Sequence, residues 1–238
     1  MLSVVSDCIV RQSAGFGVFC VDSSGFGAFR DNQITANLSY AMHVGPQLAD
    51  GNVFSGNDST GVELYGWLPV STTWPDLGVS YVIRDVYVFH SSNSPVLAIQ
   101  PGTEIRFKDL GTLKVGNAGT PTPARIVADG TAGRVRFTSA SASPSPGSFY
   151  GVYVYGNQIG ESEFRNCDFS YGGQNGDCLL YVKNSNPVIT GCDFGYSAGW
   201  GVSFKTASVP DTLALKQANT FHDNALGNIK WVPPVPGN

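Results

Sequence analysis

The chain repeats a short pattern every 20–27 residues, and this period limits its fold more than any single motif does. Its apolar anchors, spaced 24 and 20 residues apart in one group and 25 and 27 in another, are Val10, Ile34, Phe54, Phe169, Phe194 and Phe221. A small or turn-forming residue follows three positions after each anchor, and an apolar run such as "VEL" or "VSF" usually resumes soon afterwards. A unit this short cannot bury its own apolar face, so neighbouring units must stack.

Short runs with a period of two connect these anchors. The segments "YVIRDVYVF", "EIRF", "RVRFTS" and "YGVYVY" alternate in the manner of strands, and no capped helical pattern stands out. Leucine-rich repeats have a similar period, but their leucine–asparagine signature is missing. The pattern therefore predicts a coil of short strands that climbs one rung per repeat, with phenylalanine ladders inside and Asn or Ser ladders at the bends. Cys167 and Cys192, 25 residues apart, should occupy equivalent positions on adjacent rungs.

Composition agrees with such a coil and excludes several classes of partner. Charged residues make up only 13% of the chain, while 42% is apolar, which argues against disorder. The net charge is −4 and no basic stripe is present, so nucleic acid is not expected as a partner. The sequence contains no run of 18 apolar residues, so no membrane span is predicted. Five cysteines without a CxxC pair predict no metal site.

The stretch "YGWLPVSTTWPDLGVS" over residues 65–80 interrupts the alternation with two Trp and two Pro. We interpret it as the joint between two stacked modules, in which Trp67 and Trp74 cover coil ends. The predicted division is coils over 1–66, a connection over 67–80, coils over 81–232 and an extended tail over 233–238. No capping segment is evident, so end-to-end contact through uncapped coil ends is expected, or else the chain is part of a longer protein.

The order "PVLAIQPGTEIRF", "GTLKVG", "RVRFTS", "SFYGVYVY" and "SEFRNCDFSYGG" resembles the modules of right-handed parallel β-helix proteins found in bacterial surface and secreted proteins. These belong to the pectate-lyase-like superfamily. The resemblance covers about residues 79–230, and residues 1–66 resemble the closing rungs of a preceding module. It implies an all-β fold, a right-handed parallel β-helix. The superfamily includes lyases, hydrolases, epimerases, adhesins and phage tailspikes, so the resemblance is specific for fold and weak for function.

The leading functional hypothesis is a surface or secreted protein that binds carbohydrate or other cell-envelope material. The resemblance implies an extracellular or cell-surface location, although the first residues show no signal-peptide pattern. Aromatic side chains on a flat sheet stack well on sugar rings. The candidates for such stacking, which core ladders would explain equally well, are Tyr153, Tyr171, Tyr196 and Trp200.

A second hypothesis is a polysaccharide lyase or glycoside hydrolase that uses acids on the face formed by residues 161–205. Asp168 and Asp193 hold equivalent "CDF" positions, and Asp177 follows nearby. Pectate-lyase relatives combine such acids with calcium and an Arg or Lys base, a role for which Arg165 and Lys205 are the candidates; otherwise no cofactor is expected. The motifs of polygalacturonase-like hydrolases and of uronate epimerases are absent. Outward-facing, solvated acids would explain the same residues.

A third hypothesis rests on "GYSAG", which matches the nucleophile elbow of serine hydrolases around Ser197. His222, one rung further on, could serve as the base. However, Ser197 also occupies the repeat position held elsewhere by Ser13, Asn37 and Asn224, so a turn ladder explains it without catalysis.

Overall fold

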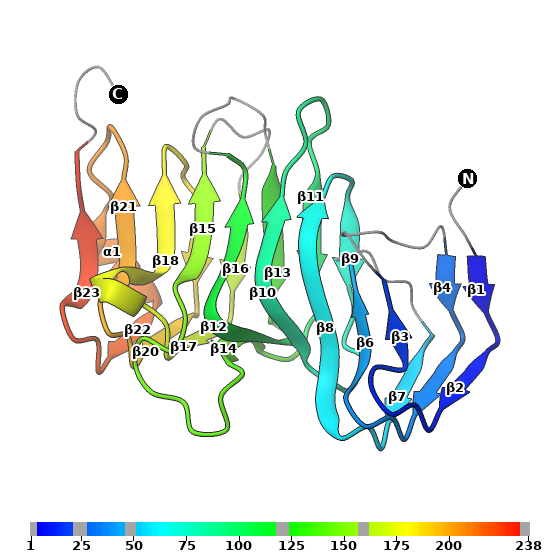
Figure 1. Ribbon diagram of the computed structural model, residues 1–238. Helices are drawn as coiled ribbons and strands as arrows, with labels where there is room; N and C mark the ends of the chain where they lie inside the picture. The colour runs from blue at the N-terminus through cyan, green and yellow to red at the C-terminus, as the bar shows by residue number, and fades with distance from the viewer. Residues whose placement is uncertain (1–3, 21–27, 46–50, 118–123, 157–161, 234–238) are drawn as a thin grey trace.

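The protein is a parallel β-helix, as its repeat predicts (Figure 1). The structure, a computed structural model, describes residues 4–20, 28–45, 51–117, 124–156 and 162–233. The first coils contain β1 (Val4–Ser6), β2 (Ile9–Arg11), β3 (Val18–Phe19), β4 (Ala28–Arg30), β5 (Gln33–Thr35), β6 (Tyr40–Val44) and β7 (Val53–Ser55). The middle coils contain β8 (Ser59–Leu68), β9 (Thr72–Trp74), β10 (Tyr81–Val88), β11 (Val96–Ile99), β12 (Glu104–Val115), β13 (Arg125–Asp129) and β14 (Val135–Ser139).

The last coils add one short helix to the strands. They contain β15 (Gly151–Tyr155), β16 (Glu163–Arg165), β17 (Cys167–Ser170), the 3-10 turn η1 (Gln174–Gly176), β18 (Cys178–Lys183), β19 (Val188–Thr190), β20 (Asp193–Gly195), β21 (Trp200–Lys205), α1 (Thr212–Ala218), β22 (Thr220–His222) and β23 (Gly227–Trp231). Helix α1, which the sequence analysis did not predict, begins after Asp211, whose carboxylate accepts a hydrogen bond from the Ala214 amide. No helix among the described residues is long and apolar enough to cross a membrane.

Parallel pairing joins each coil to the next in stacked sheets. One sheet runs in the order β3, β6, β8, β10, β12, β14, β17, β20 and β22, and a branch of it runs from β12 through β15, β18 and β21 to β23. The branch exists because β12 is long and bends round a corner: residues 104–107 pair with β14, and residues 112–115 pair with β15. The other described sheets are β9–β11–β13–β16–β19, β2–β5–β7 and β1–β4.

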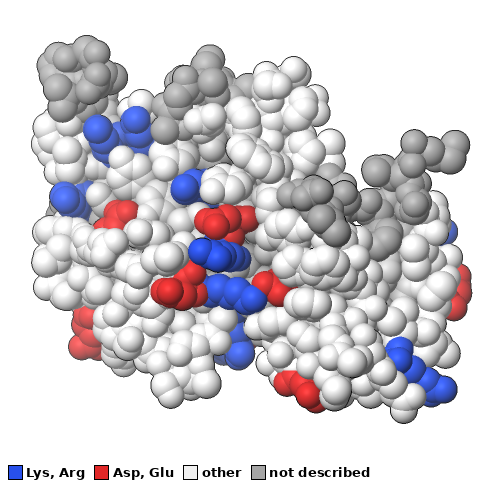
Figure 2. Space-filling model, in the orientation of Figure 1, with Lys and Arg blue, Asp and Glu red and all other residues white. Residues whose placement is uncertain are grey.

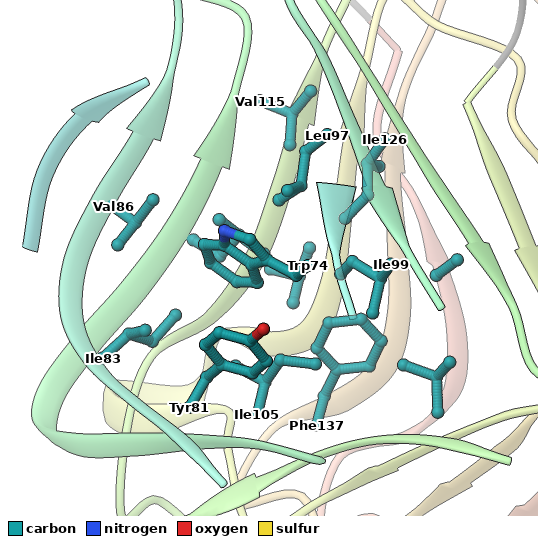
Figure 3. Packing of buried hydrophobic residues seen from close by; sticks show 14 of the residues in the cluster. Trp74, Tyr81, Ile83, Val86, Leu97, Ile99, Ile105, Val115, Ile126 and Phe137 are labelled. Carbon is teal, nitrogen blue, oxygen red and sulfur yellow. The ribbon is translucent and has the colours of Figure 1, made fainter. Parts of the chain in front are cut away.

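A continuous ladder of apolar side chains fills the coil. Pairing places in one column Val18, Met42, Val62, Tyr81, Ile105, Phe137, Phe169, Phe194 and Phe221. The Phe169 and Phe194 rings stack 4.8 Å apart, and the Phe194 and Phe221 rings 5.1 Å apart. Figure 3 shows the middle of this core, where Tyr81, Ile105 and Phe137 lie close together. The predicted phenylalanine stack is confirmed.

The six sequence anchors, however, belong to two ladders instead of one. Val10, Ile34 and Phe54 pair with one another in β2, β5 and β7, and that sheet ends at β7. The ladder of Phe169 continues through β12 and β10 to Val62 on β8. The shift is from one strand of the coil to the next, because Val18 on β3, and not Val10 on β2, belongs to the column of Phe169. Residue spacing cannot reveal such a shift, since the period is unchanged.

The bends share a two-residue pattern, in which a residue with a left-handed backbone conformation is followed by a small residue or one with a side-chain amide. Asp31, for example, has a φ of 57° and precedes the buried Asn32. Asn32 Oδ1 accepts from the Cys8 amide at 3.0 Å, and Asn52 Oδ1 accepts from the Asn32 amide at 3.1 Å. A second column follows the same rule at Ser13, Asn37 and Asn57. The ladder at the bends is confirmed, and each amide joins two coils.

Cys167 and Cys192 use the corresponding bend in the later coils. Both are buried thiols, and Sγ of Cys192 lies 3.3 Å from the carbonyl oxygen of Phe164 on the preceding coil. Asn219 continues the column, because its Oδ1 accepts from the Cys192 amide at 2.9 Å. The contact with Cys192 and burial raise the pKa of the Cys167 thiol, so it stays protonated. The repeated "CDF" therefore reflects a position that is filled by Asn in other coils.

Residues 67–80 form the end of β8, all of β9 and the turn into β10, and the sheet continues without interruption from β8 to β10. Trp74 is fully buried inside the coil and stacks on Tyr81 at 5.0 Å, so it does not cover a coil end. Trp67 is 51% exposed and stacks on Tyr87. The division into two modules stays a prediction, and residues 234–238 of the expected tail lie outside the described residues.

Candidate functional site

The outer surface of the main sheet carries a row of mostly polar side chains, which we call the cleft face. It consists of the outward-pointing residues of β6, β8, β10, β12, β14, β17, β20 and β22. One of its columns runs in register from His43 and Glu63 through Val82 and Arg106 to Thr138. Because inward positions are occupied by the apolar ladder, the alternation of each strand sends these side chains outward.

A cleft of about 580 Å³ opens on this face. Its wall includes the segment that joins β14 to β15, a loop that projects beyond the coil in Figure 1. The residues that matter most among its lining are Tyr40, Arg84, Lys108, Asp109, Ser139 and Ser148. A smaller hollow of about 260 Å³ shares Tyr40 with the cleft and adds Arg106 and Asp58, so the depression extends along the face.

Paired charges border the cleft. The Glu63 carboxylate is only 8% exposed; it accepts a hydrogen bond from Lys108 Nζ, and its Oε2 lies 3.0 Å from Nδ1 of His43. Lys108 also lies over the Tyr40 ring, 5.1 Å from its centre. Acidic and basic side chains lie close together near the middle of the view in Figure 2, whereas large areas around them are uncharged. Most of the charge in this part of the face is thus balanced locally.

The acids predicted from "CDF" lie further along the same face. Asp168 and Asp193 pair in register on β17 and β20, about 4.8 Å apart as adjacent strands are. Arg134 Nε donates to Asp168 Oδ1 at 2.5 Å, and Arg136 Nε lies 3.7 Å from its other oxygen. The structure therefore brings the two acids together, with arginines that the sequence analysis did not single out.

His222 lies next to Asp193, as neighbouring rungs predict. Its Nε2 is 3.3 Å from Asp193 Oδ2, and its Nδ1 is 2.9 Å from Asp223 Oδ2. The hydrogen bond to Asp223, together with that to Asp193, outweighs partial burial and raises the pKa of His222. Gly195 makes this placement possible, because a Cβ at that position would lie 2.3 Å from the imidazole.

Ser197 is not joined to His222. Its side chain is fully buried, and its Oγ donates to the Trp200 carbonyl at 3.0 Å and accepts from the Gly199 amide at 3.1 Å. Its own amide donates to Asn224 Oδ1, which is the bend ladder again. No hydrogen bond among the described residues connects the serine with the imidazole. The contacts of Ser197 are those of a turn, and the esterase hypothesis stays a prediction without a supporting contact.

The remaining predicted acid and bases lie apart from this row. Asp177 Oδ2 accepts a hydrogen bond from the Tyr153 hydroxyl at 2.5 Å, and burial together with this bond raises the pKa of Tyr153. Arg165 pairs with Glu163 at 3.0 Å on β16, which belongs to another sheet. Lys205 ends β21 on the branch of the main sheet. Residue 161, the first of the predicted acidic face, lies outside the described residues.

The four predicted sugar-stacking residues fall into separate groups. Tyr171 and Tyr196 stack 5.2 Å apart at the corner after β17 and β20, and Tyr196 is 40% exposed. Tyr153 is 9% exposed on β15, and Trp200 begins β21. Only the first pair adjoins the cleft face, where the Ser148 amide of the projecting loop donates to the Tyr171 carbonyl at 2.9 Å.

Sequence reasoning missed the cleft itself. Glu63 and Lys108 are 45 residues apart, and no motif links them. The signal that could have found them is the register of the strands, which brings β6, β8 and β12 together. Among the described residues, no group of three or more His, Cys, Asp or Glu side chains suits a metal ion.

Comparison of the chain with models of known protein families, with curated proteins and with solved structures gives no match.

Proposed function

We propose that this protein binds a neutral polysaccharide along the cleft face. The observation that carries the proposal is the cleft of about 580 Å³, in which the Tyr40 ring lies beside paired charges and serine hydroxyls. Sugar sites combine an aromatic surface for the ring with a few fixed polar groups for the hydroxyls. The cleft of this protein offers both within the span of a few side chains.

The balance of charge favours a neutral ligand. Lys108 is engaged by the buried Glu63, and Arg84 lies 3.9 Å from Asp85. Such pairs present both donors and acceptors in fixed positions but little net charge. A sugar hydroxyl, which donates and accepts at once, uses both kinds of group.

A chain longer than one sugar would continue beyond the projecting loop. The loop is hydrogen-bonded to Tyr171, whose ring stacks on the exposed ring of Tyr196. Ser148 of this loop lines the cleft and also bonds to Tyr171, so the loop connects the cleft with the tyrosine pair. Membership of the pectate-lyase-like superfamily, and a secreted or cell-surface location where such polymers occur, belong to the same proposal.

The test is binding to a panel of neutral polysaccharides, such as β-glucan, xylan and mannan, measured by affinity electrophoresis and calorimetry. The Tyr40→Ala variant should bind about tenfold more weakly than the unmodified protein, because it loses the stacking surface. The matched control is Trp67→Ala, which removes an exposed ring away from the cleft and should bind normally. Equal binding by both variants, or no binding to any neutral polymer, would overturn the proposal.

Glycan cleavage is a second candidate function, favoured by the register of Asp168 and Asp193. Arg134 holds Asp168 by a hydrogen bond, and His222 beside Asp193 could hold or move a proton. Cleavage predicts new reducing ends, or unsaturated products in the case of a lyase, when a panel of glycans is incubated with and without calcium. The activity should fall steeply in Asp193→Asn. Products that form equally fast with that variant would argue against this role.

A further inference from the structure

A second outer surface differs from the cleft face in its chemistry. It is formed by the branch of the main sheet, on strands β12, β15, β18, β21 and β23, and we call it the lysine face. Its cations are Lys114, Lys183, Lys205 and Lys230, and the same two columns also contain tyrosine rings. The chain as a whole carries a net charge of −4, so this concentration of lysine is a local feature.

Two of these lysines are stacked directly on each other. Lys183 and Lys205 pair in register on β18 and β21, so their side chains leave strands about 4.8 Å apart. Like charges in that position repel and destabilise a sheet. Neither lysine forms an ion pair with a carboxylate among the described residues, in contrast to Lys108 on the cleft face. The pair therefore lacks the local neutralisation that the cleft face has.

The neighbouring column places cations against aromatic rings. Lys114, Tyr153, Tyr181, Ser203 and Lys230 are in register on successive strands. Lys114 Nζ lies 6.0 Å from the centre of the Tyr153 ring. Figure 2 shows basic side chains over the part of the molecule formed by β18, β21 and β23, with few acidic ones among them. The two columns together form a surface of ammonium groups and rings, which we call the plate.

The phenols of this plate remain hydrogen-bond donors at neutral pH. Burial and the neighbouring Tyr181 raise the pKa of Tyr155 to about 12, and burial also raises the pKa of Tyr181. Tyr155 and Lys183 are paired in register, so their side chains leave neighbouring strands on the same face. A protonated phenol adds no negative charge that would oppose an anion beside the lysines.

We propose that the lysine face binds a glycan that carries phosphate groups. The adjacent ammonium groups of Lys183 and Lys205 match the charge of a phosphate monoester, about −1.5 to −2 at neutral pH, better than the single charge of a carboxylate. The rings between them supply the stacking surface for sugars. One column carries lysine at both ends, at Lys114 and Lys230, so a linear polymer that crosses the plate meets more than one cation.

The experiment compares three forms of one polymer, namely dextran, phosphate-substituted dextran and carboxymethyl-dextran, together with an oligothymidylate. We expect the protein to retain phosphate-substituted dextran selectively in affinity electrophoresis, with binding that weakens as salt rises. Equal binding to carboxymethyl-dextran would overturn the preference for phosphate. Tighter binding to the oligonucleotide would overturn the assignment to a glycan.

Variants then locate the site. Lys183→Gln combined with Lys205→Gln should weaken binding to phosphate-substituted dextran about three- to tenfold. Lys216→Gln on α1, which removes an exposed lysine elsewhere, is the control and should bind normally. Tyr40→Ala should also bind normally, because the cleft is a different surface; loss of phosphate-dextran binding in that variant would overturn the inference. Melting curves of all variants show whether the fold is kept.

Discussion

The first three coils and the last four are held together by different side chains. In the second and third coils, asparagines occupy two bends of each turn and join these coils by hydrogen bonds from Asn32 to Asn52 and from Asn37 to Asn57. One interior column of the first three coils consists of Val10, Ile34 and Phe54. The last coils instead stack phenylalanine rings and place Cys167 and Cys192 at the equivalent bend.

The two kinds of ladder contribute differently to a stacked coil, one mainly to its register and the other mainly to its stability. Amide ladders are directional, so they fix which residue lies above which, but each hydrogen bond contributes only about 1 kcal/mol net. Buried rings contribute more through the area they remove from water, yet they tolerate small slips. The final described coil uses both devices, since Asn219 and Asn224 bond to the preceding coil while Phe221 stacks on Phe194.

The comparison predicts its largest effect in the aromatic ladder. Phe194→Ala removes a fully buried ring that contacts Phe169 and Phe221, and it should lower the free energy of unfolding by about 3–5 kcal/mol. Phe221→Ala, at a half-buried position on the last described coil, should cost distinctly less. Urea denaturation followed by circular dichroism measures both, and equal losses would contradict a ladder that depends on burial.

A smaller effect is expected from the amide ladder. Asn37→Ala leaves the Ser13 amide without its acceptor and removes the hydrogen bond to Asn57. The free energy of unfolding should therefore fall by about 1–3 kcal/mol. The control is Asn186→Ala at an exposed turn position, which should change stability by less than about 0.5 kcal/mol. The same denaturation curves decide the matter, and two variants of equal stability would show that the early coils do not depend on these bonds.

The sequence was sufficient to predict the coil because its cause is local and periodic. An apolar residue, a bend residue and a second short strand recur in each unit, so Phe169, Phe194 and Phe221 could be stacked from spacing alone. The bend positions of Asn37, Asn57 and Ser197 followed from the same rule. The joining of Val10 and Phe169 into one ladder was wrong, because Val10 lies on β2 whereas Phe169 lies in the column of Val18 on β3. The period of the sequence does not tell which strand of a coil an anchor occupies.

The candidate site was predictable only where it follows the repeat. Asp168, Asp193 and His222 could be placed together, since the two acids share a column on adjacent coils and His222 lies on the next coil, opposite Gly195. Glu63 and Lys108 could not, because they come from coils two strands apart and point to each other across a face. Side-chain contacts between columns depend on strand register and on side-chain rotamers, and the period of the sequence determines neither.

The smallest expected effect is a pH dependence confined to the last described coil. Because the pKa of His222 is raised above its ordinary value by Asp223 and Asp193, the folded protein holds the proton more tightly than the unfolded chain. The resulting stabilisation is complete below the unfolded pKa of about 6.5 and is lost as the pH rises through the folded value. The imidazole is 37% exposed, so solvent screening limits the change to about 1–2 °C in melting temperature. Melting curves at about pH 5.5 and about pH 8.5, one below and one above the transition, should show this difference for the unmodified protein. They should show less of it for His222→Gln, in which the uncharged amide can still bond to Asp193. If His222→Gln keeps the full pH difference, the titrating group lies elsewhere in the protein. The last described coil would then be held to its neighbour only by ring stacking and by the hydrogen bonds of its asparagines.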